Sequence, residues 1–316
     1  MKITLEKAAG LLLEHDNILI LCHRNPDGDT LGSGFALKKL LQSLGKRVRM
    51  ECETAIPPRY DTLFGAMEPQ EQFEPDYIVA VDAADRKLLG TAIKPEQRVD
   101  LTIDHHETNK DYAEYTYVDD TAAATAEIIF RLAPLIGAEL DLRIATALYV
   151  GISTDTGCFV YSNTTARSHE TAAALIHYGI DLGTANKLLF ETKTRSRVEI
   201  DKLALNSMEF YDGGQIAFVY LPYAALQASG VTEDDLDGVS GMTRQIEGVR
   251  VGLTLRGRAD GSYKASVRTT DVNAADICAK CAGGGHKRAA GCEFASTFEE
   301  AKAKLIEAAR QVMSGC

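Results

Sequence analysis

The N-terminal part of the sequence alternates short apolar runs with segments of helical periodicity, and this alternation constrains the fold more than any other feature. The apolar runs are continuous: ILILC at 18–22, YIVAV at 77–81 and LTI at 101–103. Continuous apolar strands separated by helices are typical of a parallel sheet that is covered on both faces. We therefore predict an N-terminal α/β domain with a parallel sheet and helices on both faces.

The C-terminal part shows a different pattern, in which predicted strands follow one another closely. An Ala-Asp-Gly sequence at 259–261 offers a hairpin turn between two of them, and a helical period from Thr297 closes the chain. The segments that read as strands lie at 213–223, 249–270 and 291–295. This part is predicted to form a smaller α/β domain with a mixed sheet.

Four helical patterns lie between these two parts, at 122–136, 141–156, 165–178 and 182–208. The last is long and polar, which suits a connector between domains. A chain of 316 residues is also long for a single core, so two domains are expected. We place the first domain at 1–190, a helical linker at 191–205 and the second domain at 206–316, with the active site in the cleft between the domains.

The charge distribution narrows the choice of partner. The formal net charge is -11, which argues against a protein that coats long duplexes, because duplex binding requires many Lys and Arg residues on phosphates. From Met242 to Cys292, however, nine Lys or Arg stand against four Asp or Glu. This local excess indicates a small anionic ligand or a short strand.

The remaining composition predicts a cytoplasmic protein. Polar residues interrupt every apolar stretch within residues 1–20, so neither a signal peptide nor a membrane span is expected. The seven cysteines lie at irregular spacings. We expect them to be reduced, because a chain of this size can form a stable core without disulfides.

Polar residues directly follow three of the predicted strands. His23 follows the first, Asp82 the second, and the triplet Asp104, His105 and His106 the third. Ligands bind beyond the carboxyl ends of parallel strands in sheets of this kind. These side chains are therefore expected to converge on one edge of the sheet.

The loop after the first strand reads HRNPDGD, from His23 to Asp29. Pro26 stiffens this loop, and Gly28 allows backbone angles that other residues avoid. Asp27 and Asp29, at a spacing of two, can face the same side. One aspartate here would be interpreted as a helix cap, but two carboxylates beside a histidine indicate a binding role.

A further carboxylate, Asp155, lies on a predicted apolar helix face. Ile144, Leu148 and Gly151 precede it at helical spacing, so Asp155 occupies a position where an apolar side chain is expected. It also lies in the last helical turn, where the helix dipole disfavours negative charge by about 0.3–1 kcal/mol. A bound cation would remove both penalties.

Carboxylates gathered at one edge would repel one another and raise one another's pKa values. Arg24 is the one Lys or Arg within these motifs, so divalent cations are the expected counter-ions. Carboxylate and imidazole ligands without thiolates favour Mn²⁺, with Mg²⁺, Co²⁺ or Fe²⁺ as substitutes, over a structural zinc.

These motifs resemble those of the DHH phosphoesterase superfamily. The similar segments are HRNPDGD with LGS behind it, VDAAD, the DHH triplet and STDTG, followed in the C-terminal part by SVRT and GGGHKRAAG. They occur in the expected order over nearly the whole chain. The two-domain arrangement is similar to the group of oligoribonucleases that also dephosphorylate 3′-phosphoadenosine 5′-phosphate.

The resemblance implies a two-metal centre and a role for each residue. One metal ion would be held by His23, Asp27 and Asp82. Asp29, Asp82, His105 and Asp155 would hold the other ion, so that Asp82 bridges the two. His106 would face the phosphate and Asp104 would orient the histidines, which makes Asp82, His106 and Asp104 the expected catalytic residues. Which histidine of the triplet is the ligand stays open at this point.

The glycine loop GGGHKRAAG is the expected substrate-binding segment. Its glycines, Gly284 and Gly285 among them, expose backbone N–H groups that can hold an anion, and His286 and Arg288 add donors. The resemblance implies that Arg268 and His286 grip the distal phosphate of the substrate. The expected substrates are therefore short single-stranded RNA, cleaved to 5′-mononucleotides, and small nucleotides.

Several alternatives remain open. The same centre could hydrolyse cyclic di-AMP or its linear product, and a pyrophosphatase shares the metal motifs. A non-catalytic nucleotide or metal sensor would lack a ligand, whereas every position is filled here. Cys278, Cys281, His286 and Cys292 imitate a zinc knuckle, although the final spacing is long. A homodimer is also left open.

Overall fold

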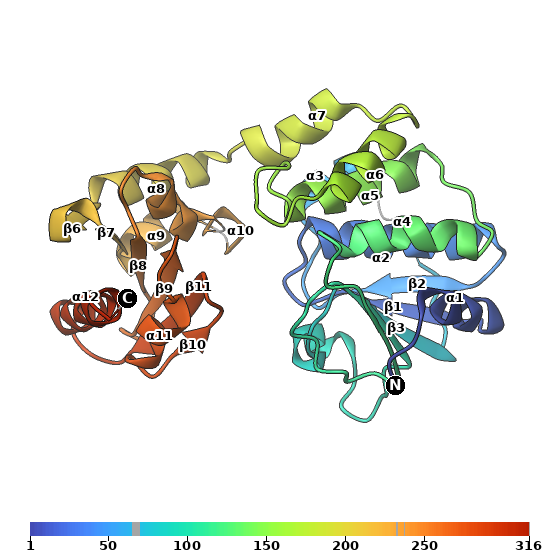
Figure 1. The fold of residues 1–316 in the computed structure, drawn as a ribbon, viewed down its shortest axis with the longest axis horizontal. Helices are drawn as coiled ribbons and strands as arrows, with labels where there is room; N and C mark the ends of the chain where they lie inside the picture. Colours follow the sequence, from blue (N-terminus) through green and yellow to red (C-terminus); the bar gives the residue numbers. More distant parts are fainter. Residues whose placement is uncertain (65–69, 232, 237, 316) are drawn as a thin grey trace. The chain divides into compact units, whose positions relative to one another are not determined.

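The computed structural model describes residues 1–64, 70–231, 233–236 and 238–315 (Figure 1). The chain divides into two compact units, Met1–Thr192 and Lys193–Cys316. Each unit has its own buried apolar core and its own sheet. No described helix has the length and apolar character needed to cross a membrane.

The first unit contains a five-stranded parallel sheet in the order β2-β1-β3-β4-β5. β1 and β3 are neighbours although β2 lies between them in sequence, so the chain order reverses at this pair. In open parallel sheets, ligands bind beyond the carboxyl ends of the strands at this kind of reversal. The strands are β1 (Ile18–Leu21), β2 (Val48–Glu51), β3 (Tyr77–Val81), β4 (Leu101–Asp104) and β5 (Tyr115–Val118).

Both faces of this sheet are covered, as the continuous apolar strands predict. Helices α2 and α4 lie across one face (Figure 1). The other face packs its Leu19 and Leu21 against Leu89 and Ile93, in and just after the 3₁₀ segment η1 (Arg86–Ala92). The helices of this unit are α1 (Leu5–Glu14), α2 (Gly28–Ser43), α3 (Pro58–Phe64), α4 (Thr125–Leu135), α5 (Leu142–Asp155), α6 (Ala166–Ile176) and α7 (Leu182–Asn186).

Glycines allow α5 to approach α2 and α4 closely. A Cβ atom at Gly32 of α2 would collide with the carbonyl oxygen of Ala147 on α5. A Cβ atom at Gly151 of α5 would lie 2.7 Å from both the Ala126 Cβ and the Asp29 Oδ1. This close packing places Asp29, near the start of α2, beside the end of α5.

The second unit contains a six-stranded mixed sheet in the order β10-β11-β9-β8-β7-β6. β7 and β8 are parallel and the other pairs are antiparallel. The tight turn at 259–261 joins β8 to β9. The strands are β6 (Glu209–Tyr211), β7 (Ile216–Leu221), β8 (Val251–Gly257), β9 (Tyr263–Thr269), β10 (Gly284–Gly285) and β11 (Ala289–Phe294).

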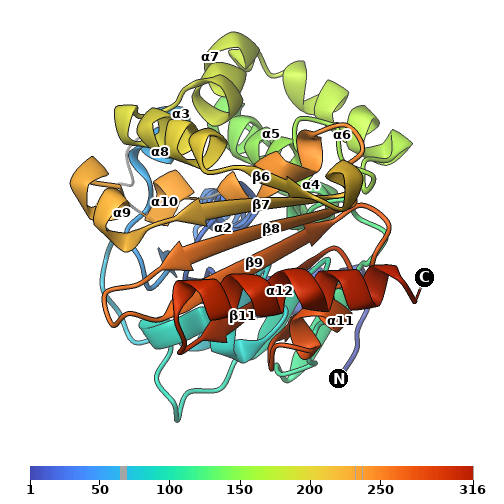
Figure 2. The ribbon, with the colours of Figure 1, turned by 90° about the vertical axis from the view of Figure 1, so that its left-hand side faces the viewer.

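Helices cover both faces of the second sheet. α12 lies along one face with α11 beside it (Figure 2), and α8 and α9 pack on the other, where Ile200 contacts the cluster of Val219 and Leu221. The remaining elements are α8 (Arg195–Asn206), η3 (Asp212–Gly214), α9 (Tyr223–Ser229), α10 (Glu233–Leu236), η4 (Val239–Gln245), α11 (Ala274–Ala279) and α12 (Phe298–Met313).

The long helix expected at 182–208 is interrupted in the structure. α7 runs into a π-helical turn, η2 (Lys187–Glu191), and the chain is extended at Thr192 before α8 begins. Thr194 caps α8, because its side chain accepts a hydrogen bond from the Arg197 amide. The expectation of one continuous helix was wrong, since this threonine starts a new helix whose Ile200 and Ala204 are buried against the second sheet.

Candidate metal centre

A cavity of about 280 Å³ lies beyond the carboxyl ends of β1 and β3. Its walls come from the loop after β1, from the residues after β3 and β4, and from the end of α5. The lining residues are His23, Arg24, Asn25, Asp27, Asp82, Leu88, His106 and Asp155. The sheet edge predicted from the strand-end residues is therefore hollow and lined by acidic and imidazole groups.

Three groups of side chains at this edge could each hold a metal ion. The ligating atoms within each group lie within 4.8 Å of one another. The groups are His23 with Asp27 and Asp82, Asp29 with His105 and Asp155, and Asp82 with His105 and His106. The structure thus brings together all six residues expected to bind metal, and Asp82 belongs to two of the groups.

Asp82 lies between the two histidines of the candidate ligand set. Its Oδ2 is 3.7 Å from the His23 Nε2, and its Oδ1 is 3.6 Å from the His105 Nε2. The Asp82 backbone has a positive φ of 54°, a conformation that side-chain-bearing residues seldom adopt. This turn comes directly after β3, and its amide still donates to the Ile103 carbonyl at 3.0 Å. Local strain of this kind is concentrated at functional sites.

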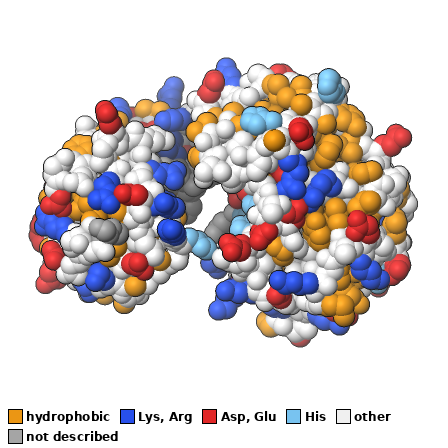
Figure 3. Space-filling view, in the orientation of Figure 1, with side chains coloured by type: hydrophobic (Ala, Val, Ile, Leu, Met, Phe, Trp, Pro, Cys, Tyr) orange, Lys and Arg blue, Asp and Glu red, His pale blue; other side chains and the backbone are white. Residues whose placement is uncertain are grey.

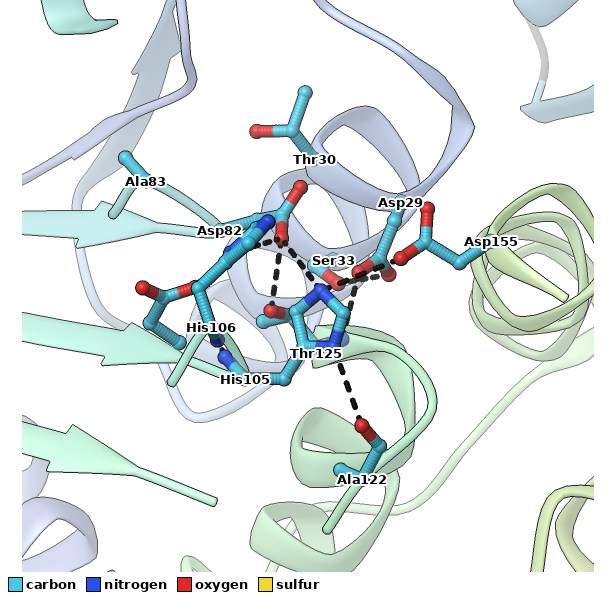
Figure 4. Close-up of polar contacts among 12 residues, drawn as sticks. Asp29, Thr30, Ser33, Asp82, Ala83, His105, His106, Ala122, Thr125 and Asp155 are labelled. Atoms are coloured by element: carbon cyan, nitrogen blue, oxygen red, sulfur yellow. Dashed lines mark hydrogen bonds and ion pairs between the residues drawn. The ribbon is translucent and has the colours of Figure 1, made fainter. Parts of the chain in front are cut away.

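The start of α4 holds Asp29 in place. The backbone amides of Thr125 and Ala126 donate to its two carboxylate oxygens at 2.6 and 2.9 Å, and the Ser33 hydroxyl donates at 3.1 Å. The Thr125 hydroxyl also donates to Asp82 Oδ1 at 3.1 Å (Figure 4). Thr125, which the sequence did not single out, therefore contacts two of the candidate ligands.

His105 has the tautomer that a metal ligand needs. Its Nδ1 lies 3.2 Å from the Ala122 carbonyl oxygen, which can only accept, so Nδ1 carries the proton (Figure 4). In the neutral ring, which is the form that binds a metal ion, Nε2 then keeps its lone pair. This atom is buried and makes no hydrogen bond within the described residues, while carboxylate oxygens of Asp155 and Asp82 lie 3.3 and 3.6 Å away. A buried, unpaired nitrogen among carboxylates fits a cation.

Asp104 orients the histidines from beneath. It is fully buried and accepts hydrogen bonds from the His106 Nδ1 at 2.7 Å, from the His105 amide at 2.9 Å and from the Asn109 side chain at 2.6 Å. Burial opposes ionisation, yet hydrogen bonding to His106 and Asn109 keeps the pKa of Asp104 below its ordinary value.

Asp27 and Asp155 complete the cluster from two helix ends. Asp27 caps α2 by accepting hydrogen bonds from the amides of Asp29 and Thr30, and its carboxylate also lies 3.5 Å from the His23 Nε2. The capping interpretation and the ligand interpretation are therefore compatible. Asp155 is the last residue of α5, and Asn163 donates to its carbonyl oxygen at 3.1 Å and to that of Ala123 at 3.2 Å.

The electrostatics of the cluster favour bound cations. Burial and the neighbouring charge of Asp155 raise the pKa of Asp29 to about 7. Burial and four nearby carboxylates, Asp29 foremost, raise the pKa of Asp82 well above its ordinary value. Burial of the His105 ring works against protonation, but Asp155 and Asp29 raise the pKa of His105 to about 9. Divalent ions would replace the protons that these groups otherwise bind.

The expected substrate residues lie together in the second unit. Arg268 is on β9, directly opposite Ala289 of β11, and the β10–β11 hairpin carries Gly284, Gly285, His286 and Arg288. Gly285 has a positive φ of 147°, and a Cβ atom there would lie 2.6 Å from the Ala290 Cα, so only glycine fits. Lys and Arg side chains gather along one side of this unit (Figure 3).

The zinc-knuckle alternative finds no support. Among the described residues, the groups whose ligating atoms approach within 4.8 Å contain no cysteine. Cys278, Cys281 and Cys292 are buried in the core of the second unit, whereas His286 is exposed. Among the described residues, His286 therefore does not join the buried cysteines in one ligand group.

The order of the parallel sheet, the acidic cluster at its reversal and the attached mixed sheet together define a class of metal-binding two-unit proteins. The model of the DHH family, N-terminal domain, matches residues 17–152, and the DHHA1 domain model matches residues 214–315. The chain belongs to the DHH family.

Two relatives and one solved structure are similar to this chain over nearly its full length. The chain is 33% identical over 305 residues to the bifunctional oligoribonuclease and PAP phosphatase NrnA of Thermus thermophilus, covering 94% of this chain and 90% of the relative. It is 25% identical to the protein of the same name from Bacillus subtilis, with 90% and 91% covered. The crystal structure of an exopolyphosphatase-related protein from Bacteroides fragilis is similar with a TM-score of 0.87 and 25% identity, covering 97% of this chain and 96% of that one.

Proposed function

We propose that this chain hydrolyses short oligoribonucleotides to 5′-mononucleotides and dephosphorylates 3′-phosphoadenosine 5′-phosphate to AMP. The chain is then a hydrolase acting on phosphoester bonds. The observation that carries the proposal is the acidic and imidazole cluster around Asp82, at the sheet edge where this fold binds its ligands. Relatives that share nearly the full length of the chain and are named for these two activities support the choice of substrate.

We propose two divalent metal ions as the cofactor, with Mn²⁺ as the preferred ion. His23, Asp27 and Asp82 would hold one ion, and Asp29, Asp82, His105 and Asp155 would hold the other. The donor set of carboxylates and imidazoles, together with the unpaired Nε2 of His105, fits this assignment. Bound divalent ions would supply Lewis acidity toward the phosphoryl group and a lowered pKa for water.

The residues of the chain then have distinct roles. His106, held through its Nδ1 by Asp104, would present its other ring nitrogen to the phosphate or to the leaving oxygen. Arg268 and His286, with the exposed amides of Gly284 and Gly285 and the guanidinium of Arg288, would bind a distal phosphate. A distal anchor would favour substrates of only a few nucleotides, because the far phosphate must reach it.

The activity assay uses synthetic RNA of two to five residues, 3′-phosphoadenosine 5′-phosphate and cyclic di-AMP with Mn²⁺. We expect mononucleotide release from the short RNAs and phosphate release from the 3′-phosphate compound. Asp82→Asn should abolish both activities, because the shared carboxylate is lost. Equal turnover of long and two-residue RNA, or cleavage of cyclic di-AMP alone, would contradict the proposed substrate.

We also propose the cytoplasm as the working compartment and short single strands, not long duplexes, as the RNA partner. All six cysteines among the described residues are free, which suits a reducing compartment. The net charge of -11 opposes binding to long nucleic acids.

A further inference from the structure

Arg24 is a cation at the mouth of the metal cavity that the proposed mechanism does not use. It follows His23 directly and lines the same cavity as Asp27, Asp82 and Asp155. It is the one Lys or Arg among the described residues that line this cavity. No ion pair or hydrogen bond engages its guanidinium within the described part of the chain.

The backbone of Arg24 is held in a fixed position. Its amide donates to the Leu88 carbonyl at 2.6 Å, and its carbonyl accepts from the Thr54 hydroxyl at 2.7 Å. Its Cβ also lies close to Gly90, where an added Cβ atom would approach it to 3.2 Å. These contacts fix the backbone of Arg24 beside the cavity that this residue lines.

The charges of the carboxylates, of two divalent ions and of a bound phosphate indicate what the Arg24 guanidinium could bind. Asp27, Asp29, Asp82 and Asp155 carry four negative charges when ionised, which two divalent ions would cancel. A phosphodiester adds one negative charge and a phosphomonoester dianion adds two. The dianion therefore leaves the greater uncompensated charge in the cavity, and its partner must be a cation that is not already paired.

We propose that Arg24 binds the non-bridging oxygens of the phosphoryl group at the metal centre and raises the preference of the enzyme for terminal phosphomonoesters over internal phosphodiesters. This inference rests on the proposed function and names the chemical class of substrate that one residue selects. The guanidinium is suited to this task because its N–H groups match phosphate oxygens in pairs.

The test compares wild type with Arg24→Gln, Arg24→Lys and a control, Arg47→Gln. Arg47 is an exposed arginine that directly precedes β2, at the amino end of this strand, whereas the metal cavity lies at the carboxyl ends. Arg47 forms an ion pair with Glu71. We expect Arg24→Gln to lower kcat/KM for 3′-phosphoadenosine 5′-phosphate by about tenfold or more, and that for linear pApA by less than about threefold. Arg24→Lys should recover part of the loss, and Arg47→Gln should match wild type.

Calorimetry supplies a readout that does not depend on turnover. Binding of inorganic phosphate in the presence of Mn²⁺ should weaken by about tenfold in Arg24→Gln, while Mn²⁺ binding itself stays unchanged. Equal losses on both substrates, or unchanged phosphate affinity, would overturn the inference. If wild type cleaves neither substrate, the proposed function fails, and the phosphate titration still tests Arg24 separately.

Discussion

Thr125 contacts two candidate metal ligands through two different atoms, its amide on Asp29 and its hydroxyl on Asp82. Because Asp82 is buried and belongs to two of the possible metal-binding groups, its orientation affects both. The hydrogen bond from the Thr125 hydroxyl restricts rotation of the Asp82 carboxylate. Groups that orient metal ligands in this way commonly change affinity by about 10–100-fold when they are removed.

Thr125→Val removes the hydroxyl and keeps the backbone amide. We expect the Mn²⁺ affinity to fall by about tenfold and kcat to fall with it, because Asp82 loses a donor that orients it. Calorimetric Mn²⁺ titration measures the change. Thr146→Val is the matched control, since among the described residues the Thr146 hydroxyl donates to the Leu142 carbonyl of its own helix and to no other group. Equal affinity in both variants would show that the hydroxyl does not orient the ligand.

The raised pKa values of the cluster predict a pH dependence of metal binding. Without metal, Asp29, with a pKa of about 7, and His105, with a pKa of about 9, bind protons near neutral pH. Metal must displace these protons, so Mn²⁺ affinity should rise from pH 6 to pH 8. Titrations in buffers of different ionisation enthalpy measure the protons released. A pH-independent affinity with no proton release would contradict the predicted ligand set.

At the scale of elements, the contact between α2 and α5 sets the distance between Asp29 and Asp155. Asp29 lies near the start of α2 and Asp155 is the last residue of α5, and both belong to one possible metal-binding group. The close approach of the two helices depends on Gly32 and Gly151. A helix interior with glycine is less stable than one with alanine by about 0.5–1 kcal/mol. The two glycines are needed in spite of this loss of helix stability, because a side chain at either position would push α2 and α5 apart.

Gly32→Ala tests this dependence. A methyl group at Gly32 meets the Ala147 carbonyl oxygen, so the free energy of unfolding should fall by about 1–3 kcal/mol, and Mn²⁺ affinity should weaken. Urea unfolding and metal titration report the two effects. Gly10→Ala on α1 is the control, because no described atom beyond its chain neighbours and its own helix backbone lies within 4 Å of the added Cβ. This substitution should stabilise the protein. Stabilisation by Gly32→Ala would refute the close-packing explanation.

At the scale of the whole molecule, the metal centre and the expected phosphate-binding hairpin belong to units with separate cores. The candidate ligands lie in Met1–Thr192, and Arg268 and the glycine hairpin lie in Lys193–Cys316. Metal binding at the proposed ligands would therefore couple to the folding of the first unit. In the proposed function, the first unit would hold the reacting phosphate, and the cations of the second unit would bind a second phosphate.

Removing the metal should destabilise the first unit selectively. Free Mn²⁺ at a hundredfold above its Kd adds about 2.7 kcal/mol to the folded state that binds it. Hydrogen exchange measured with Mn²⁺ and with a chelator should show slower exchange in β1, β3, α2 and α5 when metal is present. Amides of α12 and β9 should exchange at the same rate in both conditions. Equal protection of both units would place metal binding elsewhere or join the units into one cooperative body.

The sequence by itself predicted the parallel sheet, the mixed sheet and the sheet edge at which the acidic and imidazole residues gather, and the family resemblance added the assignment of six of them as metal ligands. A strand that is apolar on both faces is buried only in a sheet that is covered on both sides. In a parallel sheet of this kind, the polar residues that follow the strands lie at one edge. Asp155 was identifiable because a carboxylate on an apolar helix face is costly. Each of these predictions depends on residues that are close together in the sequence.

Contacts between distant segments could not be predicted in this way. Thr125 meets Asp29 across 96 positions of sequence, the Ala122 carbonyl selects the tautomer of His105, and Asn163 joins two loops through backbone carbonyls. The sequence analysis also did not predict the positive φ of Asp82 or the break in the helix before Thr194. Each depends on the packing of one element against another, which a pattern along the chain does not record. This packing orients the acidic and imidazole residues into a candidate metal site.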